Sequence, residues 1–298
     1  MGWPKAITQW WSDDVGYLSI PFTWLLPEAR QRVIQGNMFV SRWVVGGPAV
    51  ELLSSYLAGL ANVEIGHGMA GILQRVNPDA TRTTLGCPNR CRFCAIGQRR
   101  IEGKFRELDD WPNLPIVCDS NLTAASMRHF EKVISRLRDL SWCDFNQGLD
   151  CSRLTQQHAR LLATLNRPVI RLALDSDAER VPWESAVHRL LDAGLAKRSI
   201  RSYVLVGFDE SPAAAWERCE WIEAWGIKAY PQWFHALDAL ERNRVTFEQV
   251  AHGWTYAEQQ RIMGYYYRHR GQPGVLHANT PVDVYPNLSR CKIIPVED

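Results

Sequence analysis

The stretch TRTTLGCPNRCRFCAIGQRR, residues 81–100, decides how the whole chain is interpreted. It holds three of the eight cysteines of the chain within eight positions, at a C-x3-C-x2-C spacing. A chance scatter of eight cysteines over 298 positions does not produce such a triplet. The run TRTTLG leads directly into it and has the composition of a β-strand. The sequence therefore predicts a loop after a strand that presents Cys87, Cys91 and Cys94 to one ligand.

Three cysteines favour an iron-sulfur cluster over a structural zinc ion. Structural zinc takes four ligands, commonly in two close pairs. This chain has no second C-x-x-C, and the histidine nearest to the triplet, His67, lies twenty residues upstream. A cluster held by three thiolates leaves one iron without a protein ligand, and a catalytic metal site needs such an open position. Zinc and a cluster that only carries electrons remain the alternatives.

The composition is that of a folded protein with no strong overall charge. Hydrophobic residues make up 46% of the chain and charged residues 22%, which excludes a disordered or fibrous protein. A formal net charge of +2 is not the cationic balance of a protein devoted to nucleic acid. The start does not resemble a signal peptide, and no apolar run is long enough to span a bilayer. We therefore expect a cytoplasmic protein with reduced thiols, in which the triplet binds metal instead of forming disulfides.

From residue 81 onward, short apolar runs alternate with longer amphipathic stretches, a pattern typical of successive βα units on a parallel sheet. The pattern predicts six strands, at 81–86, 114–119, 143–148, 168–175, 200–208 and 228–236. Six such units predict an α/β fold, either a partial (β/α)6 barrel or a strongly curved open sheet. In folds of this kind the functional residues lie at the carboxyl ends of the strands.

The segments between the strands have the apolar periodicity of helices. One helix is expected to begin at Thr123, whose hydroxyl would cap it, and to continue to residue 140. Three more are expected within 154–165, 183–195 and 211–226. The last two are expected to end at Gly194 and Gly226, because helices often end at glycine.

The sequence divides into three parts around this alternation. Residues 1–80 form an N-terminal α/β extension, in which residues 37–60 predict one strand, a Gly-Gly turn and one helix, and VEIGHG (63–68) a further short strand. Residues 81–240 form the sheet with its helices. Residues 241–298 form a C-terminal helical extension. We expect both extensions to pack against the sheet and to close the barrel.

Together with Phe93, the triplet resembles the signature of the radical SAM superfamily, C-x3-C-x-Φ-C, in which Φ is aromatic and the loop follows the first barrel strand. The resemblance implies a [4Fe-4S] cluster on the three cysteines, whose free iron is chelated by S-adenosylmethionine. Reductive cleavage of that cofactor would give methionine and a 5′-deoxyadenosyl radical that abstracts hydrogen from a substrate. VVGGPAV resembles the last strand and turn of the cobalamin-binding domain that precedes many such cores, and residues 1–80 would then be a degenerate remnant of it.

The same resemblance assigns cofactor contacts at three strand ends. In CDSN, Asp119 or Asn121 would accept a hydrogen bond from the amino group of S-adenosylmethionine, although this segment departs from the Gly-Gly-Glu of the family and Asn121 suits a helix cap equally well. In YVLVGFDE, Gly207 and Glu210 match positions that contact adenine, and a place in the first turn of a helix is the alternative for Glu210. Asp175 stands where the family binds the ribose, with a helix cap as its alternative.

Polar residues near the strand ends are the candidates for substrate binding and catalysis. Asn146, Gln147 and Asp150 follow the third strand and would face the same cavity as the cluster, although a turn uses the same residue types. Arg171 lies in an apolar strand, where a charge needs a partner, and Asp150 or an anionic group of the substrate would supply one. His235 on the sixth strand is a further candidate, with a histidine satisfied in the core as its alternative.

A basic patch surrounds the later part of the triplet and bears on what docks there. It consists of Arg90, Arg92, Arg99, Arg100, Lys104 and Arg106. Such a patch suits an acidic electron donor, reduced flavodoxin or ferredoxin, and also an anionic substrate. The expected substrate is a polar small molecule such as a nucleoside or an amino acid. Radical modification of a nucleic-acid base or another macromolecular residue is the first alternative, and a non-enzymatic iron-sulfur or zinc module is the second.

Overall fold

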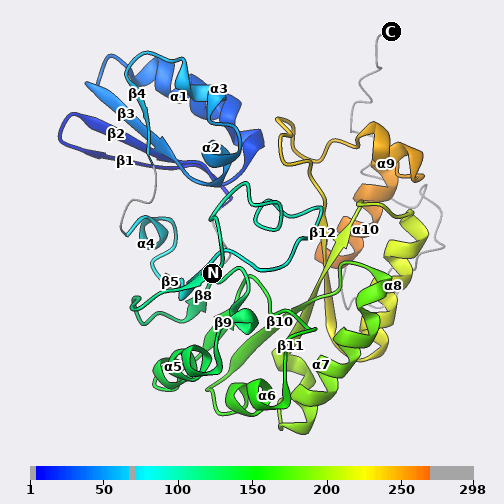
Figure 1. Cartoon of the computed structure of the whole chain (residues 1–298). Coiled ribbons are helices and arrows are strands. Elements are labelled where there is room, and N and C mark those ends of the chain that lie inside the picture. Colours follow the sequence, from blue (N-terminus) through cyan, green and yellow to red (C-terminus); the bar gives the residue numbers. More distant parts are fainter. Residues whose placement is uncertain (1–4, 67–70, 269–298) are drawn as a thin grey trace.

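The computed structural model describes residues 5–66 and 71–268, and its first part is a small unit with its own core (Figure 1). Its sheet has the order β1 (Thr8–Ser12), β2 (Val15–Ser19), β3 (Arg42–Gly46) and β4 (Val63–Ile65). The β1–β2 pair is antiparallel and the other pairs are parallel. The helical segments of the unit are η1 (Thr23–Leu25), α1 (Leu26–Gly36), α2 (Pro48–Leu52) and α3 (Ser55–Ala58).

The predicted strand, Gly-Gly turn and short strand of this unit correspond to β3, the turn before α2, and β4, whereas the one predicted helix is divided into α2 and α3. The turn needs glycine at Gly47, because its φ is +98° and a Cβ atom there would stand 2.7 Å from the carbonyl oxygen of Ile20. The β1–β2 hairpin and α1 were not predicted. The start of α1 has Pro27 and Glu28 in its first turn, which are signals of a helix start, but its N-cap residue, Leu25, makes no side-chain capping bond.

A six-stranded sheet forms the second and larger part. Its order is β12 (Lys228–Trp233), β11 (Ile200–Val206), β10 (Pro168–Ala173), β9 (Cys143–Phe145), β8 (Ile116–Val117) and β5 (Ala80–Thr81). Every neighbouring pair is parallel. The six predicted strands are therefore confirmed as a parallel sheet, and their order in space follows their order in the sequence. All carboxyl ends consequently lie along one edge, which we call the carboxyl edge.

The first predicted strand, 81–86, was wrong in its extent. After β5 the chain leaves the parallel sheet, and β6 (Thr84–Leu85) pairs antiparallel with β7 (Arg106–Glu107) instead. The reason is local, because the N–H groups of Thr83 and Thr84 donate to the carboxylate of Asp119 and not to a neighbouring strand. The long loop between β6 and β7 holds the cysteine triplet.

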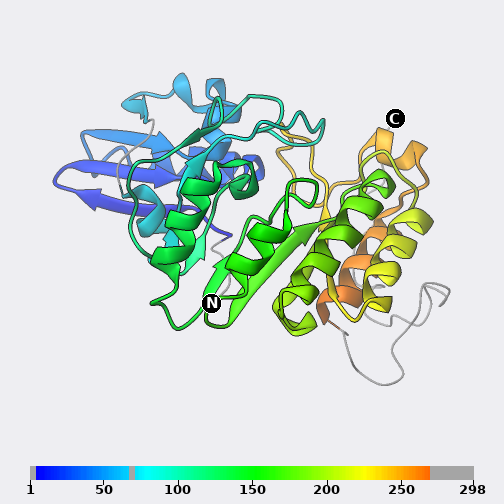
Figure 2. The ribbon, with the colours of Figure 1, turned by 60° about the horizontal axis from the view of Figure 1, so that its bottom comes forward.

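Helices cover one face of the parallel sheet (Figure 2). They are α5 (Met127–Leu137), α6 (Gln156–Leu162), α7 (Arg180–Asp192) and α8 (Pro212–Ala224), with the short segments α4 (Ile72–Val76), η2 (Leu122–Ala124), η3 (Asp177–Glu179) and η4 (Lys197–Ser199) between strands. Along β10, Ile170 and Leu172 are buried in the core that these helices form, while Arg171 between them points to the opposite face. One face of the sheet is thus core, and the other is partly exposed.

The expected helix start at Thr123 was wrong. Helix α5 begins after Ser126, whose Oγ accepts a hydrogen bond from the N–H of His129 at 3.2 Å. Thr123 lies in η2, and its hydroxyl donates to Asn121 Oδ1 at 3.1 Å. The glycines that end α7 and α8 are as predicted, since Gly194 and Gly226 both have positive φ values.

The two ends of the described chain contact the sheet differently. The N-terminal unit lies at the carboxyl edge, where Thr23 Oγ1 donates to the carbonyl of Ala239 at 2.6 Å (Figure 1). At the other end, α9 (Phe247–Ala251) and α10 (Tyr256–Arg268) pack beside β12 and α8, and Trp254, Ile262 and Tyr266 belong to the core of the parallel sheet. Within the described residues, no helix has the length and apolarity needed to cross a membrane.

Candidate metal centre and its surroundings

The loop between β6 and β7 is folded tightly around the three cysteines. It begins at Gly86, which has a φ of +71°, and a Cβ atom there would stand 2.8 Å from the backbone of Lys104. Gly97 lies equally close to Cys91, because an added Cβ atom would be 2.8 Å from the backbone nitrogen and oxygen of that cysteine. The N–H of Cys94 donates to the carbonyl of Cys91 at 3.2 Å. Glycine is therefore required at two positions of this loop.

The three thiols are free and lie close enough to affect one another. Cys87 is buried, while Cys91 and Cys94 are half-buried. The pKa of Cys91 is raised to about 11, first by burial and then by the proximity of Cys94 and Cys87. Burial also raises the pKa of Cys94, although the N–H groups of Gly97 and Ile96 hydrogen-bond its sulfur and act in the opposite direction. A bound metal would lower these pKa values, since metals bind the thiolate form.

The chemistry of this donor set suits an iron-sulfur cluster. Among residues 5–66 and 71–268, no three His, Cys, Asp or Glu side chains are arranged to hold a metal ion. Thiolates are the ligands that iron-sulfur clusters use, and they also bind zinc. The three cysteines therefore match a cluster by ligand type alone.

A hydrogen-bond network joins the triplet to the ends of β8 and β9. Asn121 donates through Nδ2 to Cys87 Sγ at 3.4 Å and to Asp150 Oδ2 at 3.1 Å. Asn89, in the cysteine loop, donates to the same Asp150 oxygen at 2.8 Å. Burial acts to raise the pKa of Asp150, but hydrogen bonds from Ser152, Asn89 and Asn121 outweigh it and hold that pKa below its ordinary value. Two predicted site residues, Asn121 and Asp150, thus meet at the triplet, and Asn121 caps no helix.

Asp119, at the end of β8, is bonded through both carboxylate oxygens. Its Oδ1 accepts from the N–H groups of Thr83 at 2.5 Å and Thr84 at 2.9 Å, and its Oδ2 accepts from the Thr83 hydroxyl. Asp119 is 2% exposed, and burial raises its pKa to about 6. Its bonds fasten the end of β8 to the residues that lead into the cysteine loop.

Acidic side chains from the end of β10 lie near the same loop. Asp175 Oδ1 accepts from the N–H of Leu205 at 3.1 Å, and the Asp175 N–H donates to Glu179 at 2.8 Å. Burial, followed by the charge of Glu179, raises the pKa of Asp175 to about 7. Both carboxylates also act to raise the pKa of Cys91. Asp175 therefore caps no helix, and Glu179 is a neighbour of the triplet that the sequence analysis missed, since nothing in its local pattern marks it.

The next strand end, after β11, presents Gly207 and Glu210. Gly207 has a φ of +83°, and a Cβ atom there would stand 2.6 Å from the Trp233 ring. Glu210 accepts from the N–H of Gly207 at 3.3 Å and pairs with Arg218. Burial raises the pKa of Glu210 to about 7. Glu210 does not lie in the first turn of α8, because that helix begins after its N-cap, Ser211.

Arg171 does not bind Asp150, one of the two partners expected for it. Its guanidinium bonds Asp144 through Nε at 2.7 Å and Nη2 at 2.5 Å, and not Asp150. The third contact, from Nη1, goes to Tyr203 Oη at 2.8 Å, and that hydroxyl donates to the carbonyl of Asn146 at 2.8 Å. Although burial acts to lower the pKa of Arg171, the bonds to Asp144 outweigh it and raise that pKa. Asp144 was missed because strand register, and not sequence spacing, brings it to Arg171.

Aromatic rings connect the cysteine loop to the ends of β11 and β12. The Phe93 ring contacts Phe208 edge-on, with 5.6 Å between centroids, and Phe208 contacts Phe234 in the same way at 4.8 Å. Arg92 lies over the Phe208 ring at 5.5 Å and pairs with Asp209. The aromatic position of the cysteine motif is therefore packed against the strand end that carries Gly207.

Two predicted substrate contacts lie outside this network. His235 accepts a hydrogen bond at Nε2 from the N–H of Asn243 at 3.0 Å, and its ring stands 4.4 Å from that of Trp24. Burial lowers the pKa of His235. Gln147 is exposed and makes no side-chain hydrogen bond within the described residues. His235 therefore helps to join the N-terminal unit to the carboxyl edge.

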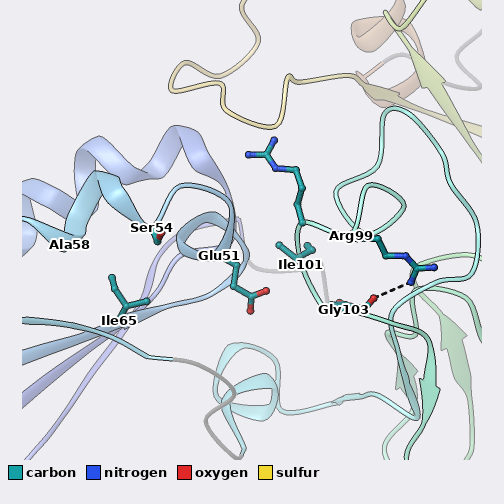
Figure 3. A pocket seen from close by; sticks show the side chains of 9 residues that line it. Glu51, Ser54, Ala58, Ile65, Arg99, Ile101 and Gly103 are labelled. Atoms are coloured by element: carbon teal, nitrogen blue, oxygen red, sulfur yellow. Dashed lines mark hydrogen bonds between the residues drawn. The ribbon is translucent and has the colours of Figure 1, made fainter.

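A pocket of about 640 Å³ separates the N-terminal unit from the cysteine loop (Figure 3). Residues of α2, α3 and β4 line one side, and residues 99–103 line the other. Two arginines of the basic patch lie here: Arg99 donates to the carbonyl of Gly103 at 3.2 Å, and Arg100 to that of Leu52 at 3.3 Å. The patch is thus partly used in holding the loop and the N-terminal unit together.

Comparisons with known proteins add no assignment to this geometry. Neither protein-family models nor curated protein sequences match the chain. The site is therefore interpreted from its own residues, which gather the cysteine triplet, Asn121, Asp150 and Asp175 at one edge of a parallel sheet.

Proposed function

We propose that the protein is a radical SAM enzyme whose barrel is the six-stranded parallel sheet. One observation carries the proposal: the loop with Cys87, Cys91 and Cys94 follows the first strand of a parallel sheet whose six strands run in sequence order. Functional residues of such sheets gather at the carboxyl edge. At that edge Asn121, after β8, donates to Cys87, and Asp150, after β9, accepts from Asn121.

The three cysteines would hold a [4Fe-4S] cluster, and reduced flavodoxin or ferredoxin would supply its electron. When bound, the cluster passes that electron to S-adenosylmethionine, which yields methionine and a 5′-deoxyadenosyl radical that takes a hydrogen atom from the substrate. Asn121 would orient Cys87 through its N–H···S hydrogen bond, and Asp150 would hold Asn121 in place. Hydrogen bonds to cluster sulfurs are one of the factors that set a cluster's reduction potential.

The neighbouring strand ends would bind the rest of S-adenosylmethionine. Asp175 has a carboxylate oxygen beyond its bond to Leu205, and that oxygen suits a ribose hydroxyl. Phe208 beside Phe93 offers an aromatic surface for adenine next to Gly207. The aromatic row of Phe93, Phe208 and Phe234 would limit access of water to the radical.

The site favours a polar small molecule as substrate over a nucleic acid. Two arginines of the basic patch, Arg99 and Arg100, bond backbone carbonyls, and Arg92 pairs with Asp209. Cations committed in this way are poorly placed to track a phosphate backbone. The face of the sheet opposite the helices carries Arg171, Asp144 and Tyr203, which bond one another before the strands reach the carboxyl edge. These groups suit a polar small molecule.

The decisive experiment compares the wild-type protein with Cys91→Ala and Cys291→Ala after anaerobic purification and cluster reconstitution. The wild type and Cys291→Ala, which removes a cysteine outside the motif, should hold about four iron atoms per chain. With dithionite and S-adenosylmethionine both should form 5′-deoxyadenosine. Cys91→Ala should do neither. Zinc in place of iron, or a reduced-cluster electron paramagnetic resonance signal that S-adenosylmethionine leaves unchanged, would contradict the proposal.

A further inference from the structure

Most helices of the described chain pack on one face of the parallel sheet, while the opposite face is contacted at β12 by α10, whose Tyr267 stands against Tyr230 and bonds Gln232. Along β10 and β11, alternate residues are buried against the helices, and the residues between them are partly exposed on the opposite face. Parallel sheets normally have both faces covered. This opposite face carries the polar or charged residues Asp144, Arg171, Arg201, Tyr203, Lys228, Tyr230 and Gln232. Hydrogen bonds within the fold account for Asp144, Arg171, Tyr203 and Gln232, but not for Arg201 and Lys228.

Strand register brings three cations of this face into one row. In the strand register, Arg171 of β10 stands opposite Arg201 of β11, and Arg201 stands opposite Lys228 of β12. Adjacent strands lie about 4.8 Å apart, and side chains at paired positions stand on the same face of a sheet. Each cation comes from a different strand, so the sequence gives no sign of the row.

The charges of this row are only partly balanced. Asp144 binds Arg171 with two hydrogen bonds and neutralises it. Arg201 and Lys228 have no ion pair or side-chain hydrogen bond among the described residues, and both lie over the Tyr230 ring, 5.9 and 5.3 Å from its centroid. Like charges on adjacent strands destabilise a sheet. Two adjacent positive charges without a carboxylate are therefore costly unless an anion binds between them.

We infer that Arg201 and Lys228, which stand in register with Arg171, bind the phosphate group of a small-molecule substrate. The two unbalanced charges match a phosphate monoester, which carries about −1.5 to −2 at neutral pH. A guanidinium offers paired N–H donors to phosphate oxygens, and the Tyr230 ring holds both cations by cation–π attraction. The inference rests on the proposed function for the chemistry that the substrate undergoes, and it adds the class of that substrate.

The position of the row also constrains the shape of the substrate. Arg171 precedes Asp175 by four residues, a distance of about 13 Å at about 3.3 Å per strand residue. Asp175 marks the carboxyl edge beside the cysteine loop. A phosphate bound at the row and a reacting group at the edge therefore belong to an elongated molecule that lies along the face of the sheet opposite the helices.

The test is calorimetric titration of the full-length protein with inorganic phosphate at low ionic strength, in a buffer free of phosphate. Arg201→Gln and Lys228→Gln should each weaken binding about tenfold, because each removes a charged hydrogen-bond donor. Arg160→Gln is the matched control, since it removes an exposed arginine from α6 on the helical side of the sheet and should leave the affinity unchanged. Circular dichroism and thermal unfolding verify that the variants fold.

Three results would overturn the inference: no phosphate binding by the wild type, equal affinity in Arg201→Gln and the wild type, or an equal loss in Arg160→Gln. A fourth result would change the ligand from a small phosphate compound to a nucleic acid. Tight, salt-sensitive binding of a single-stranded RNA oligonucleotide that Arg201→Gln abolishes would assign the row to nucleic acid.

The outcome is separable from that of the proposed function, because phosphate binding requires neither cluster nor S-adenosylmethionine. A wild type that cleaves S-adenosylmethionine but binds phosphate no better than Arg201→Gln would keep the proposed function and refute the phosphate site. A wild type that holds no iron but loses phosphate affinity on the Arg201→Gln change would keep the phosphate site and refute the proposed function.

Discussion

Single side chains around the cysteine loop are held by partners from other strands. Cys87 receives a hydrogen bond from Asn121, and Asn121 is held by Asp150. Asp119 binds the backbone just before the loop. Each of these contacts joins residues that are distant in the sequence, so the loop keeps its conformation through the sheet below it and not through its own sequence alone.

Gly97→Ala should distort the cysteine loop and impair metal loading. An added Cβ atom would meet the backbone of Cys91 at 2.8 Å, and relieving that contact should cost about 1–3 kcal/mol of stability. Iron content after reconstitution and the midpoint of thermal unfolding measure the effect. Gly59→Ala is the control, because a Cβ atom there would have no neighbour within 4 Å. Equal iron content in Gly97→Ala and Gly59→Ala would contradict the geometry of the loop.

Asp175→Asn should change how stability depends on pH. The pKa of Asp175 is raised from 3.8 to about 7, so between these values the folded chain holds a proton that the unfolded chain releases. Stability therefore falls as pH rises from about 4 to about 7, and this contribution disappears in Asp175→Asn. Urea unfolding at about pH 5 and about pH 7.5 measures the difference. Asp139→Asn, at an exposed position, should keep the wild-type dependence; the same dependence in Asp175→Asn would refute the assignment.

Helices and strands of the larger part begin and end where particular side chains satisfy the backbone. Ser126 caps α5, and Thr155 and His158 form a capping box at the start of α6. The chain leaves the parallel sheet at Thr83, where Asp119 supplies the acceptor. Thr123 was an attractive cap by its sequence, but its hydroxyl is used in bonds to Asn121 and to the Asp150 carbonyl.

Ser126→Ala should destabilise the protein by about 1 kcal/mol, the usual loss when a helix N-cap is removed. The serine hydroxyl accepts from the N–H of His129 and donates to Glu107, and alanine can do neither. Urea unfolding at neutral pH measures the loss. Ser141→Ala should be neutral, since the Ser141 side chain makes no hydrogen bond among the described residues. If Ser126→Ala lowered the free energy of unfolding less than Thr123→Ala does, the Ser126 cap would contribute less to stability than the Thr123 contacts, which would contradict the prediction.

The whole molecule is organised around the carboxyl edge of its parallel sheet. The N-terminal unit has a core of its own, yet Thr23 and Trp24 contact residues 235–239 beyond β12, and Leu52 accepts a bond from Arg100 in the cysteine loop. The contacts at residues 235–239 and at Arg100 lie at two separate places along the carboxyl edge. The unit thereby borders the candidate site.

Trp24→Ala should loosen the N-terminal unit from the sheet. Loss of the half-buried indole and of its contact with His235 should cost about 1–2 kcal/mol. Because the two parts have separate cores, calorimetry should resolve the single unfolding transition into two. Trp11→Ala removes an indole that is 59% exposed on β1 and should leave a single transition. A single transition in Trp24→Ala would mean that the interface depends on other contacts.

Local pattern in the sequence was enough for the existence and order of the six parallel strands, but not for the end of the first strand or the start of α5. The alternation of apolar runs predicted all six strands, because a strand buried on one face needs apolar side chains at regular positions. The cysteine spacing likewise predicted one loop with three thiols. The β1–β2 hairpin and α1 were missed, although Pro27 and Glu28 in the first turn of α1 are signals of a helix start.

The sequence by itself therefore determined the α/β class, the places of the six strands along the chain, and the cysteine loop. All three depend on neighbours along the chain. Tertiary structure decided which side chains meet: Asp144 and not Asp150 at Arg171, Glu179 near Cys91, and Arg201 beside Lys228. The physical reason is register. Strand pairing, and not distance along the chain, sets which polar groups lie within hydrogen-bonding reach, and local periodicity does not encode it.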